Sequence, residues 1–194
     1  MPRQVDHEQR RREIAEATWR AIDELGVDGT TMRAIADRAA CTTGRLNHYF
    51  ERREDMLVAA LRLAHERAGE RMANAVRGKA GRDAVRAVLL EALPLDDERR
   101  AEWKVWWTFW TQAISGDALR LEHERRYQEW RSLVLELVRH AAPARSRDEI
   151  GRIADSLVAL VDGLGVEATV VAGASTLRRA RRVVDTQLEL LLPS

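Results

Sequence analysis

The sequence predicts an all-α protein of about nine helices. Apolar residues recur at helical spacing almost throughout the 194 residues, and no segment alternates polar and apolar residues long enough to make a convincing strand. Only 11 Gly and 4 Pro interrupt the chain, while 45% of residues are hydrophobic and 32% are charged, which indicates an ordered globular protein. The chain contains no internal repeat and no low-complexity tract.

Two helices are predicted before residue 41. The first ends at Gly26, before a turn at residues 27–29, and its apolar face holds Ile14, Thr18, Ala21, Ile22 and Leu25. Thr30 or Thr31 can cap the second helix, over residues 32–40, through a side-chain oxygen.

A very short connection then leads to a third and a fourth helix. Thr42 is a good N-cap for the third helix, residues 43–50, in which Leu46 points inward with Tyr49 or Phe50. The fourth helix begins at about Glu54 and is expected to bury Leu57, Ala60, Leu61 and Ala64.

Prolines, caps and a glycine delimit the later helices. Pro94 and Pro143 mark boundaries, Ser146 and Glu149 form a capping box, and Gly173 breaks the helix that this box opens. The sequence predicts helices that begin at Asp96 or Asp97, Asp117, Ser146 and Ser175 and end at about Ser115, Ala142, Ala172 and Leu192.

The helices at 32–40 and 43–50, joined by a tight connection, predict a helix-turn-helix. The second helix of such a motif projects from the body and fits the major groove of DNA. Here Arg45 can pair with guanine, Thr43 can contact a thymine methyl, and Gly44 lets the backbone come close, while Asn47, His48 and Tyr49 can reach bases or phosphates. A solvated helix hairpin would look similar, so a helical ligand-binding or scaffolding protein without DNA binding remains the alternative.

Residues 30–57, TTMRAIADRAACTTGRLNHYFERREDML, resemble the DNA-binding domain of the TetR family of bacterial repressors. The resemblance rests on the Thr pair, the Ile-Ala, the Gly and Leu of the third helix, the His-Tyr-Phe run and the Arg-Glu before Leu57. It implies a helix-turn-helix domain at residues 1–55 and a ligand-binding and dimerisation domain at residues 56–194. The DNA-contacting residues it favours are Thr31, Arg33, Thr42, Thr43, Gly44, Arg45, Asn47, His48, Tyr49 and Arg53.

Three positions depart from the family pattern. Ala40 stands where the turn glycine is usual, so the turn is expected to be strained or differently shaped. Asn47 replaces an aromatic residue, and Arg52 replaces the serine that caps the fourth helix. Arg53 replaces the usual lysine and can still hold a phosphate.

The formal net charge of +1 means that a DNA partner must be met by a local basic patch. Basic residues gather around the motif at Arg33, Arg38, Arg45, Arg52 and Arg53. A second group lies in an N-terminal arm, which would either enter the minor groove or remain a solvated tail, and consists of Arg3, Arg10, Arg11 and Arg12.

One short helix reads too few bases for genomic specificity, so we expect a homodimer that sets two recognition helices on a palindromic operator of double-stranded DNA. The C-terminal helices are apolar enough to supply a dimer interface through Leu157, Val161, Leu164, Val184 and Leu188, although these residues could equally be plain core. The TetR resemblance implies that the two helices pair with their mates in a four-helix bundle.

The segment EWKVWWTFWTQAIS carries the second informative pattern. Trp103, Trp106, Trp107 and Trp110 fall within one stripe of about 100° on a helix, and Tyr127 and Trp130 could face it. Such a stripe is either core packing or the lining of a cavity for an apolar or cationic effector. The segments RRYQEWRSLVLELV and LVDGLGVEA also resemble the choline-sensing glycine-betaine repressors.

Other functional classes find little support. No Glu lies three residues before any of the 5 His, and no HExxH motif or Gly-rich phosphate loop is present, so no enzyme, metal site or cofactor is expected. The single Cys41 excludes an internal disulfide and most simply fills the motif's turn as a small apolar residue, with a redox thiol as the lesser alternative. No apolar run reaches the length of a signal peptide or membrane helix, so we expect a cytoplasmic protein with no membrane partner.

Overall fold

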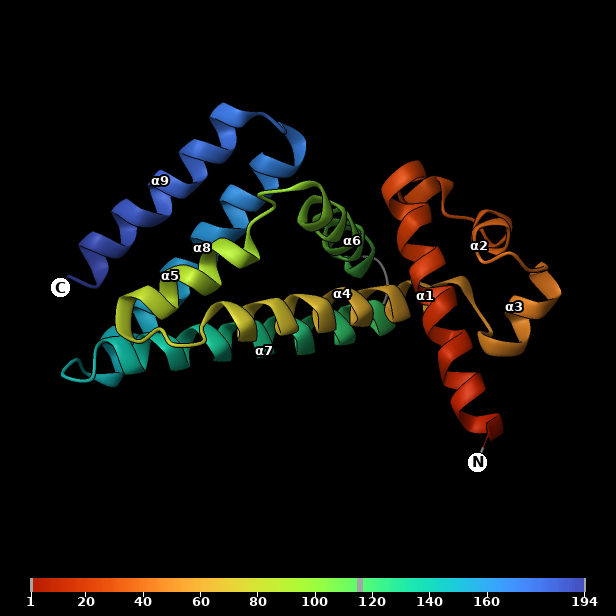
Figure 1. The fold of residues 1–194 in the computed structure, drawn as a ribbon, viewed down its shortest axis with the longest axis horizontal. Helices are drawn as coiled ribbons and strands as arrows, with labels where there is room; N and C mark the ends of the chain where they lie inside the picture. The colour runs from red at the N-terminus through yellow and green to blue at the C-terminus, as the bar shows by residue number, and fades with distance from the viewer. Residues whose placement is uncertain (1, 115–116, 194) are drawn as a thin grey trace. The chain divides into compact units, whose positions relative to one another are not determined.

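The computed structural model of the chain describes residues 2–114 and 117–193, which form nine helices and no strand (Figure 1). The all-α prediction is therefore confirmed for these residues. In chain order the helices are α1 (Pro2–Gly29), α2 (Met32–Arg38), α3 (Thr43–Tyr49), α4 (Arg53–Ala75), α5 (Gly81–Ala92), α6 (Asp97–Ala113), α7 (Asp117–Ala141), α8 (Arg147–Val170) and α9 (Ala174–Leu191). Sequence patterns set no bounds for α5, and the predicted end of α6 at about Ser115 lies outside the described residues.

The helices group into two compact units. The first unit comprises Met1–Arg67 and Lys104–Glu124, and the second comprises Ala68–Trp103 and Arg125–Ser194. The helices α4, α6 and α7 each contribute residues to both units. The domain boundary expected between residues 55 and 56 stays a prediction.

In the first unit, α1 consists of two helical segments that meet at Gly26. Gly26 has φ 69° and ψ −178°, a left-handed conformation that glycine adopts without a steric penalty. The prediction that Gly26 breaks the helix is confirmed. Residues 27–29, predicted as a turn, instead add a short helical segment before α2 begins.

Apolar residues from the first four helices share one core. Its members are Ile14, Ala17, Ala21, Ile35, Ala36, Ala39, Leu46, Phe50 and Met56. The residues predicted to face inward from α4, namely Leu57, Ala60, Leu61 and Ala64, are also buried. This core fixes which faces of α2 and α3 remain outward.

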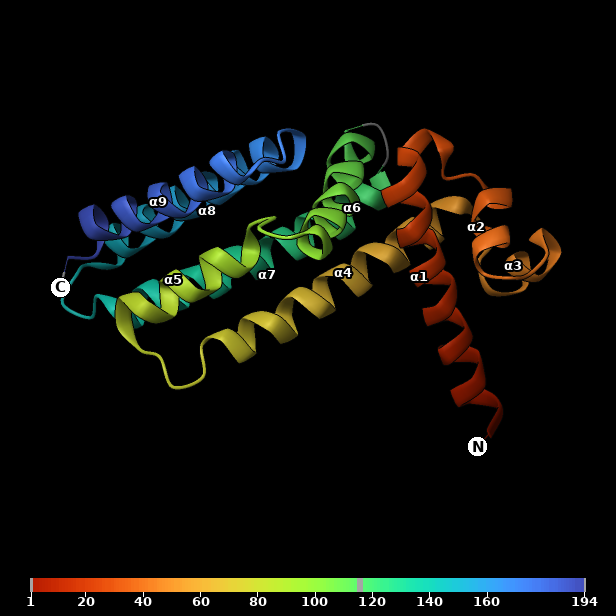
Figure 2. The ribbon, with the colours of Figure 1, turned by 45° about the horizontal axis from the view of Figure 1, so that its top comes forward.

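In the second unit, α8 and α9 run side by side, and α5 packs against both (Figures 1 and 2). Ser146 and Glu149 form the predicted capping box, in which each accepts a hydrogen bond from the main chain of the other. The five residues predicted for the dimer interface, Leu157, Val161, Leu164, Val184 and Leu188, are at most 7% exposed within the protomer. The plain-core interpretation therefore fits these five side chains within the protomer, and their place in a dimer interface stays a prediction.

Trp103 packs against the backbone of α8. A Cβ built at Gly165 would overlap the six-membered ring of Trp103, so only glycine leaves room for the indole. The indole Nε1 donates a hydrogen bond to the carbonyl of Ala92 at 2.7 Å, and the side chain is only 7% exposed. Trp103 is thus a core residue that joins α6 to α5 and α8.

We expect Gly165→Ala to lower the free energy of unfolding by roughly 1–3 kcal/mol, because the added methyl forces the Trp103 indole out of its place. Gly151→Ala is the matched control, since it lies on the same helix with open space where a Cβ would be. It should leave stability unchanged or raise it by up to about 1 kcal/mol through helix propensity. Urea unfolding followed by circular dichroism measures both, and equal stability of the two variants would contradict this packing.

Candidate nucleic-acid interface and effector site

The turn between α2 and α3 is tight and strained. Ala40 has φ 49°, and among the described residues it is the one non-glycine with a positive φ. A side chain in this region costs about 1–2 kcal/mol relative to the right-handed conformation. The strain expected from the missing turn glycine is therefore present. Cys41 follows, half-buried, and its amide donates to the carbonyl of Ala36 at 3.0 Å.

Both helices of the motif begin at the predicted threonine caps. The Thr31 hydroxyl accepts from the amide of Ala34 at 3.1 Å, and the Thr42 hydroxyl accepts from the amide of Arg45 at 3.2 Å. Each hydroxyl keeps its own hydrogen for another acceptor. A phosphate placed at either helix start would meet that donor and the positive end of the helix dipole.

The α3 helix separates an inward side from an outward side. Leu46 has no exposed surface and Phe50 is 3% exposed, which fixes the rotation of α3 about its axis. The predicted DNA-contacting residues Thr43, Gly44, Arg45, Asn47 and His48 are all exposed, as is Arg33 on α2. Tyr49 is half-buried. The arrangement therefore presents a guanidinium, an amide and an imidazole from one short helix.

Arg53 has a second role that the sequence did not reveal. Its Nε donates to the carbonyl of Thr30 at 2.6 Å, and its Nη2 donates to the carbonyl of Val27 at 2.5 Å. These bonds tie the start of α4 to the segment that enters α2. The two N–H groups of Nη1 and the second N–H of Nη2 are left for the phosphate contact that was predicted.

The arginines of the expected N-terminal arm lie on α1, which is helical from Pro2 onward, and not on a tail. Arg10 donates to the carbonyl of Ala39 at 3.0 Å, and Arg11 donates to the carbonyl of Tyr49 and lies 4.1 Å from the centroid of the Phe50 ring. Arg12 pairs with Glu66 of α4 at 3.1 Å. These three side chains hold α1 to its neighbours, and the side chain of Arg3 lies outside those that the structure describes.

An aromatic cluster at the end of α3 also escaped the sequence patterns. The ring of Tyr49 lies 4.8 Å from that of His7 on α1 and 5.3 Å from that of His48, measured between centroids. His7 is exposed, so a second imidazole borders the candidate DNA-contacting face. Its separation of 41 residues from His48 left no local signal.

Three of the predicted effector-site tryptophans belong to the first unit. Trp106 meets His65 of α4 edge-on at 6.2 Å, and Trp110 meets His123 of α7 edge-on at 6.3 Å between ring centroids. Trp107 lies 6.0 Å from Trp110 and is 43% exposed. Burial lowers the pKa of His123, which favours the neutral imidazole beside Trp110.

The other three predicted residues belong to the second unit. Trp103 is part of the core described above, and Trp130 is half-buried. The Tyr127 hydroxyl donates to the carboxylate of Asp162 on α8. Burial, reinforced by this hydrogen bond, raises the pKa of Tyr127, and burial also raises the pKa of Asp162. The predicted stripe of four indoles is therefore divided, with Trp103 committed to packing.

Two buried carboxylates were missed by sequence reasoning. In the first unit, Glu122 accepts two hydrogen bonds from Arg62 of α4, each at 3.0 Å. In the second unit, Glu102 is 4% exposed and accepts from Arg71 of α4 at 2.6 Å. Removing either arginine would take two charge-assisted hydrogen bonds from a buried carboxylate, which is destabilising.

Metal-ligating clusters and membrane-spanning helices are both absent from the residues that the structure describes. No three His, Cys, Asp or Glu residues among them gather closely enough to hold a metal ion. None of their helices is long and apolar enough to cross a membrane.

Comparisons with known proteins agree along the whole chain. Residues 14–67 match the family model for bacterial regulatory proteins of the tetR family, and residues 81–193 match the model for the C-terminal part of BetI-type transcriptional repressors. The HTH-type transcriptional regulator PksA of Bacillus subtilis is 35% identical over 191 residues, covering 97% of this chain and 93% of the relative. The HTH-type transcriptional regulator BetI of Burkholderia thailandensis is 33% identical over 197 residues, covering 99% and 98%.

Solved structures show the same fold. A transcriptional regulator from Saccharomonospora viridis, in complex with choline, aligns with a TM-score of 0.85 at 24% identity and covers 94% of this chain and 96% of that one. A transcriptional regulator from Rhodococcus sp. Rha1 aligns with a TM-score of 0.84 at 24% identity, covering 94% and 95%.

Proposed function

The chain belongs to the TetR family of bacterial transcriptional regulators and is a DNA-binding regulator, and from this premise we propose that it represses transcription as a homodimer released by a small cation. The observation that carries the proposal is the outward face of α3. Leu46 and Phe50 anchor the helix, so that Arg45 and Asn47 point away from the core. Family membership decides against the alternative of a helical ligand-binding or scaffolding protein without DNA binding.

Base recognition is proposed to lie in α3, with phosphate contacts from its surroundings. Arg45 is exposed and can donate two hydrogen bonds to guanine, while Asn47 can pair with adenine. The hydroxyl groups and helix starts at the Thr31 and Thr42 caps support a role for these residues in phosphate contacts. This arrangement would let each protomer read one half-site of a palindrome, with half-site centres about 34–36 Å apart.

A different face of α8 and α9 is proposed for dimerisation. We define the α8–α9 flank as Ser156, Ala159, Leu160, Gly163, Val170, Val183 and Leu190, which lie beside the core-facing residues and are at least partly exposed. Val170 is 74% exposed and Leu190 is 69% exposed. The small residues of the flank on α8, Ser156, Ala159 and Gly163, would allow close approach of a second helix pair. Pairing of this flank with its copy would cover the apolar side chains that the protomer leaves in water.

The effector is proposed to be a small organic cation of the choline type. Indole rings attract quaternary ammonium groups through cation–π contacts, and Trp106 and Trp110 are half-buried beside imidazoles in the first unit. The match to BetI-type C-terminal regions and the choline complex of the Saccharomonospora viridis protein support this class of ligand. An apolar effector is the second candidate, because the exposed part of Trp107 suits uncharged ligands as well. Either ligand would act in the cytoplasm, and its effect is limited to its differential affinity for the two states.

Arg45→Ala is expected to weaken binding to the preferred operator by roughly 1–3 kcal/mol and to relax selection at one base position in each half-site. Arg178→Ala removes an equally exposed arginine from α9 and should leave binding unchanged. Selection of bound duplexes from random DNA compares the variants. An unaltered base preference in Arg45→Ala would rule out its reading role.

Gly163→Arg is expected to raise the dimer dissociation constant roughly 100-fold or more, because an unpaired charge buried in an interface costs about 3–5 kcal/mol. Gly151→Arg is the control, since Gly151 also has open space where a Cβ would be but lies about 120° around α8 from Gly163. Sedimentation velocity reads out the oligomeric state of both. Persistence of the wild-type dimer in Gly163→Arg would show that the α8–α9 flank is not the interface.

Choline is expected to shift tryptophan emission and to release the protein from its operator. Its uncharged isostere 3,3-dimethyl-1-butanol should bind roughly tenfold more weakly, because the cation–π attraction is lost. Trp106→Phe should weaken choline binding, whereas Trp103→Phe, in the core, should mainly lower stability. Equal binding of choline and the isostere would favour the apolar class of effector. No response to choline would refute the choline-type effector.

A further inference from the structure

The segment from Asp23 to Thr31 comprises the end of α1 and the connection to α2, and we call it the α1–α2 junction. Gly26 interrupts helical geometry in its middle, and Thr31 at its end is the N-cap of α2. The direction in which the chain leaves α1 therefore sets where α2 and α3 lie. The Thr30 hydroxyl stabilises this bend internally by donating to the carbonyl of Gly26 at 2.7 Å.

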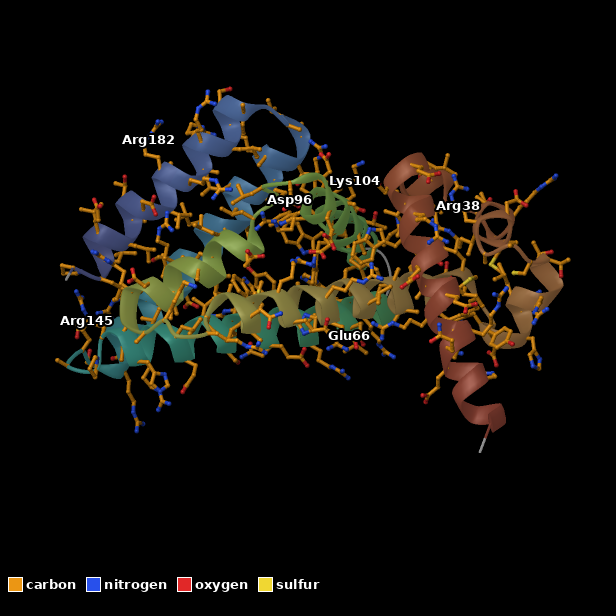
Figure 3. The ribbon with its side chains drawn as sticks, in the orientation of Figure 1. Arg38, Glu66, Asp96, Lys104, Arg145 and Arg182 are labelled. Atoms are coloured by element: carbon orange, nitrogen blue, oxygen red, sulfur yellow. The ribbon has the colours of Figure 1, made fainter. Side chains whose placement is uncertain are left out.

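Two cationic side chains from other helices donate to main-chain carbonyls of this junction. Arg53, at the start of α4, binds the carbonyls of Val27 and Thr30. Lys104, labelled on α6 in Figure 3, donates from Nζ to the carbonyl of Asp23 at 3.0 Å and to its Oδ1 at 2.5 Å. All of these residues belong to the first unit.

The chemistry of Lys104 suits the end of a helix segment. Carbonyls in the last turn before a helix break carry the negative end of the dipole, so a cation placed there is favourable. An ammonium is compact and has three donors, which lets it bind the carbonyl and the carboxylate of a single residue. Lys104 thus fixes Asp23 in two places at once.

The solvent exposure of this pair argues for a role in orientation and against a large role in folding. The side chains of Lys104 and Asp23 are 40% and 39% exposed, and exposed ion pairs contribute little to overall stability. Arg53, by contrast, is bound to two carbonyls and is half-buried. The α1–α2 junction is therefore held more firmly by Arg53 of α4 than by Lys104 of α6.

We propose that Lys104 is a positioning residue for operator recognition, which fixes the end of α1 from α6 and thereby sets the direction of the helix-turn-helix. It does not touch DNA and acts only through the α1–α2 junction. The inference rests on the proposed function, because orientation matters when two recognition helices must match two half-sites. Since α6 also carries Trp106 and Trp110, Lys104 would pass a shift of α6 directly to the α1–α2 junction.

The test compares Lys104→Met with the wild-type protein on the selected operator and on duplexes lengthened or shortened by one base pair between half-sites. Lys104→Met should lose roughly three- to tenfold in affinity for the native spacing, the range open to a half-exposed charge-assisted hydrogen bond. It should lose less on the altered spacings, so that the spacing preference shrinks. Lys104→Arg keeps a cationic donor and should restore the preference.

Lys79→Met is the matched control, because Lys79 is the only other lysine in the sequence and also donates to a main-chain carbonyl, that of Ala75 at 2.6 Å. It should behave as wild type. Amide hydrogen exchange of the free proteins gives a second measurement, in which residues 24–34 should exchange faster in Lys104→Met than in Lys79→Met or wild type.

An unchanged spacing preference with unchanged exchange would overturn the proposal. Equal loss on all spacings together with a lowered melting temperature would also overturn it, because it would indicate a merely structural role. If the wild-type protein itself shows no spacing preference, the proposed dimeric mode fails and the positioning role falls with it. Exchange in the free protein then still reports whether Lys104 holds the junction.

Discussion

The motif depends on arginines of α1 that donate to the carbonyls at the ends of its two short helices. Helices of seven residues are marginal in water by themselves, and their last carbonyls need donors. Arg20 and Arg10 of α1 donate to the carbonyls of Arg38 and Ala39 at the end of α2, and Arg11 donates to the carbonyl of Tyr49 at the end of α3. These bonds act together with the burial of apolar residues beneath the motif. The same contacts that stabilise α2 and α3 therefore also fix them on α1.

This use of arginine inside the first unit limits the charge available for DNA. Arginines that bind carbonyls or acidic residues within the protein cannot also neutralise phosphates at full strength, which leaves Arg33, Arg45 and Arg52 as the exposed arginines of the motif. Arg52 is itself within 3.4 Å of Asp55. With few exposed cations around the motif, non-specific attraction to DNA is modest, so affinity would depend on base contacts and, in the proposed dimer, on the pairing of two protomers. The near-neutral net charge therefore fits the proposed dimer, in which two protomers would share the binding of one operator.

The sequence predicted what local rules determine and missed what distant neighbours determine. The caps at Thr31 and Thr42, the inward Leu46 and the strained Ala40 follow from residues within a few positions of each other, and the structure confirms all four. Periodicity also found the apolar faces of α8 and α9, but it cannot say whether a face is covered by the same protomer or by a second one. The core positions of Leu157 and Val184 show the limit of that rule. The match between Trp103 and Gly165 spans 62 positions, and nothing near either residue indicates it.

The division of the tryptophan stripe bears on how an effector would act. Trp106 and Trp110 share the first unit with the helix-turn-helix, so a ligand bound at these rings would lie in the same compact unit as the DNA-contacting face. Coupling between ligand binding and the helix-turn-helix would then need few intervening residues, since α6 also carries Lys104, which binds the end of α1. A ligand can shift an equilibrium only by its differential affinity for the two states, so the contacts that it must overcome have to be weak. The half-exposed pair of Lys104 and Asp23 meets that requirement, whereas the pair of Arg62 and Glu122, whose carboxylate is buried and accepts two hydrogen bonds from the guanidinium, would resist it. The weaker contact is therefore the one at which release from DNA would begin.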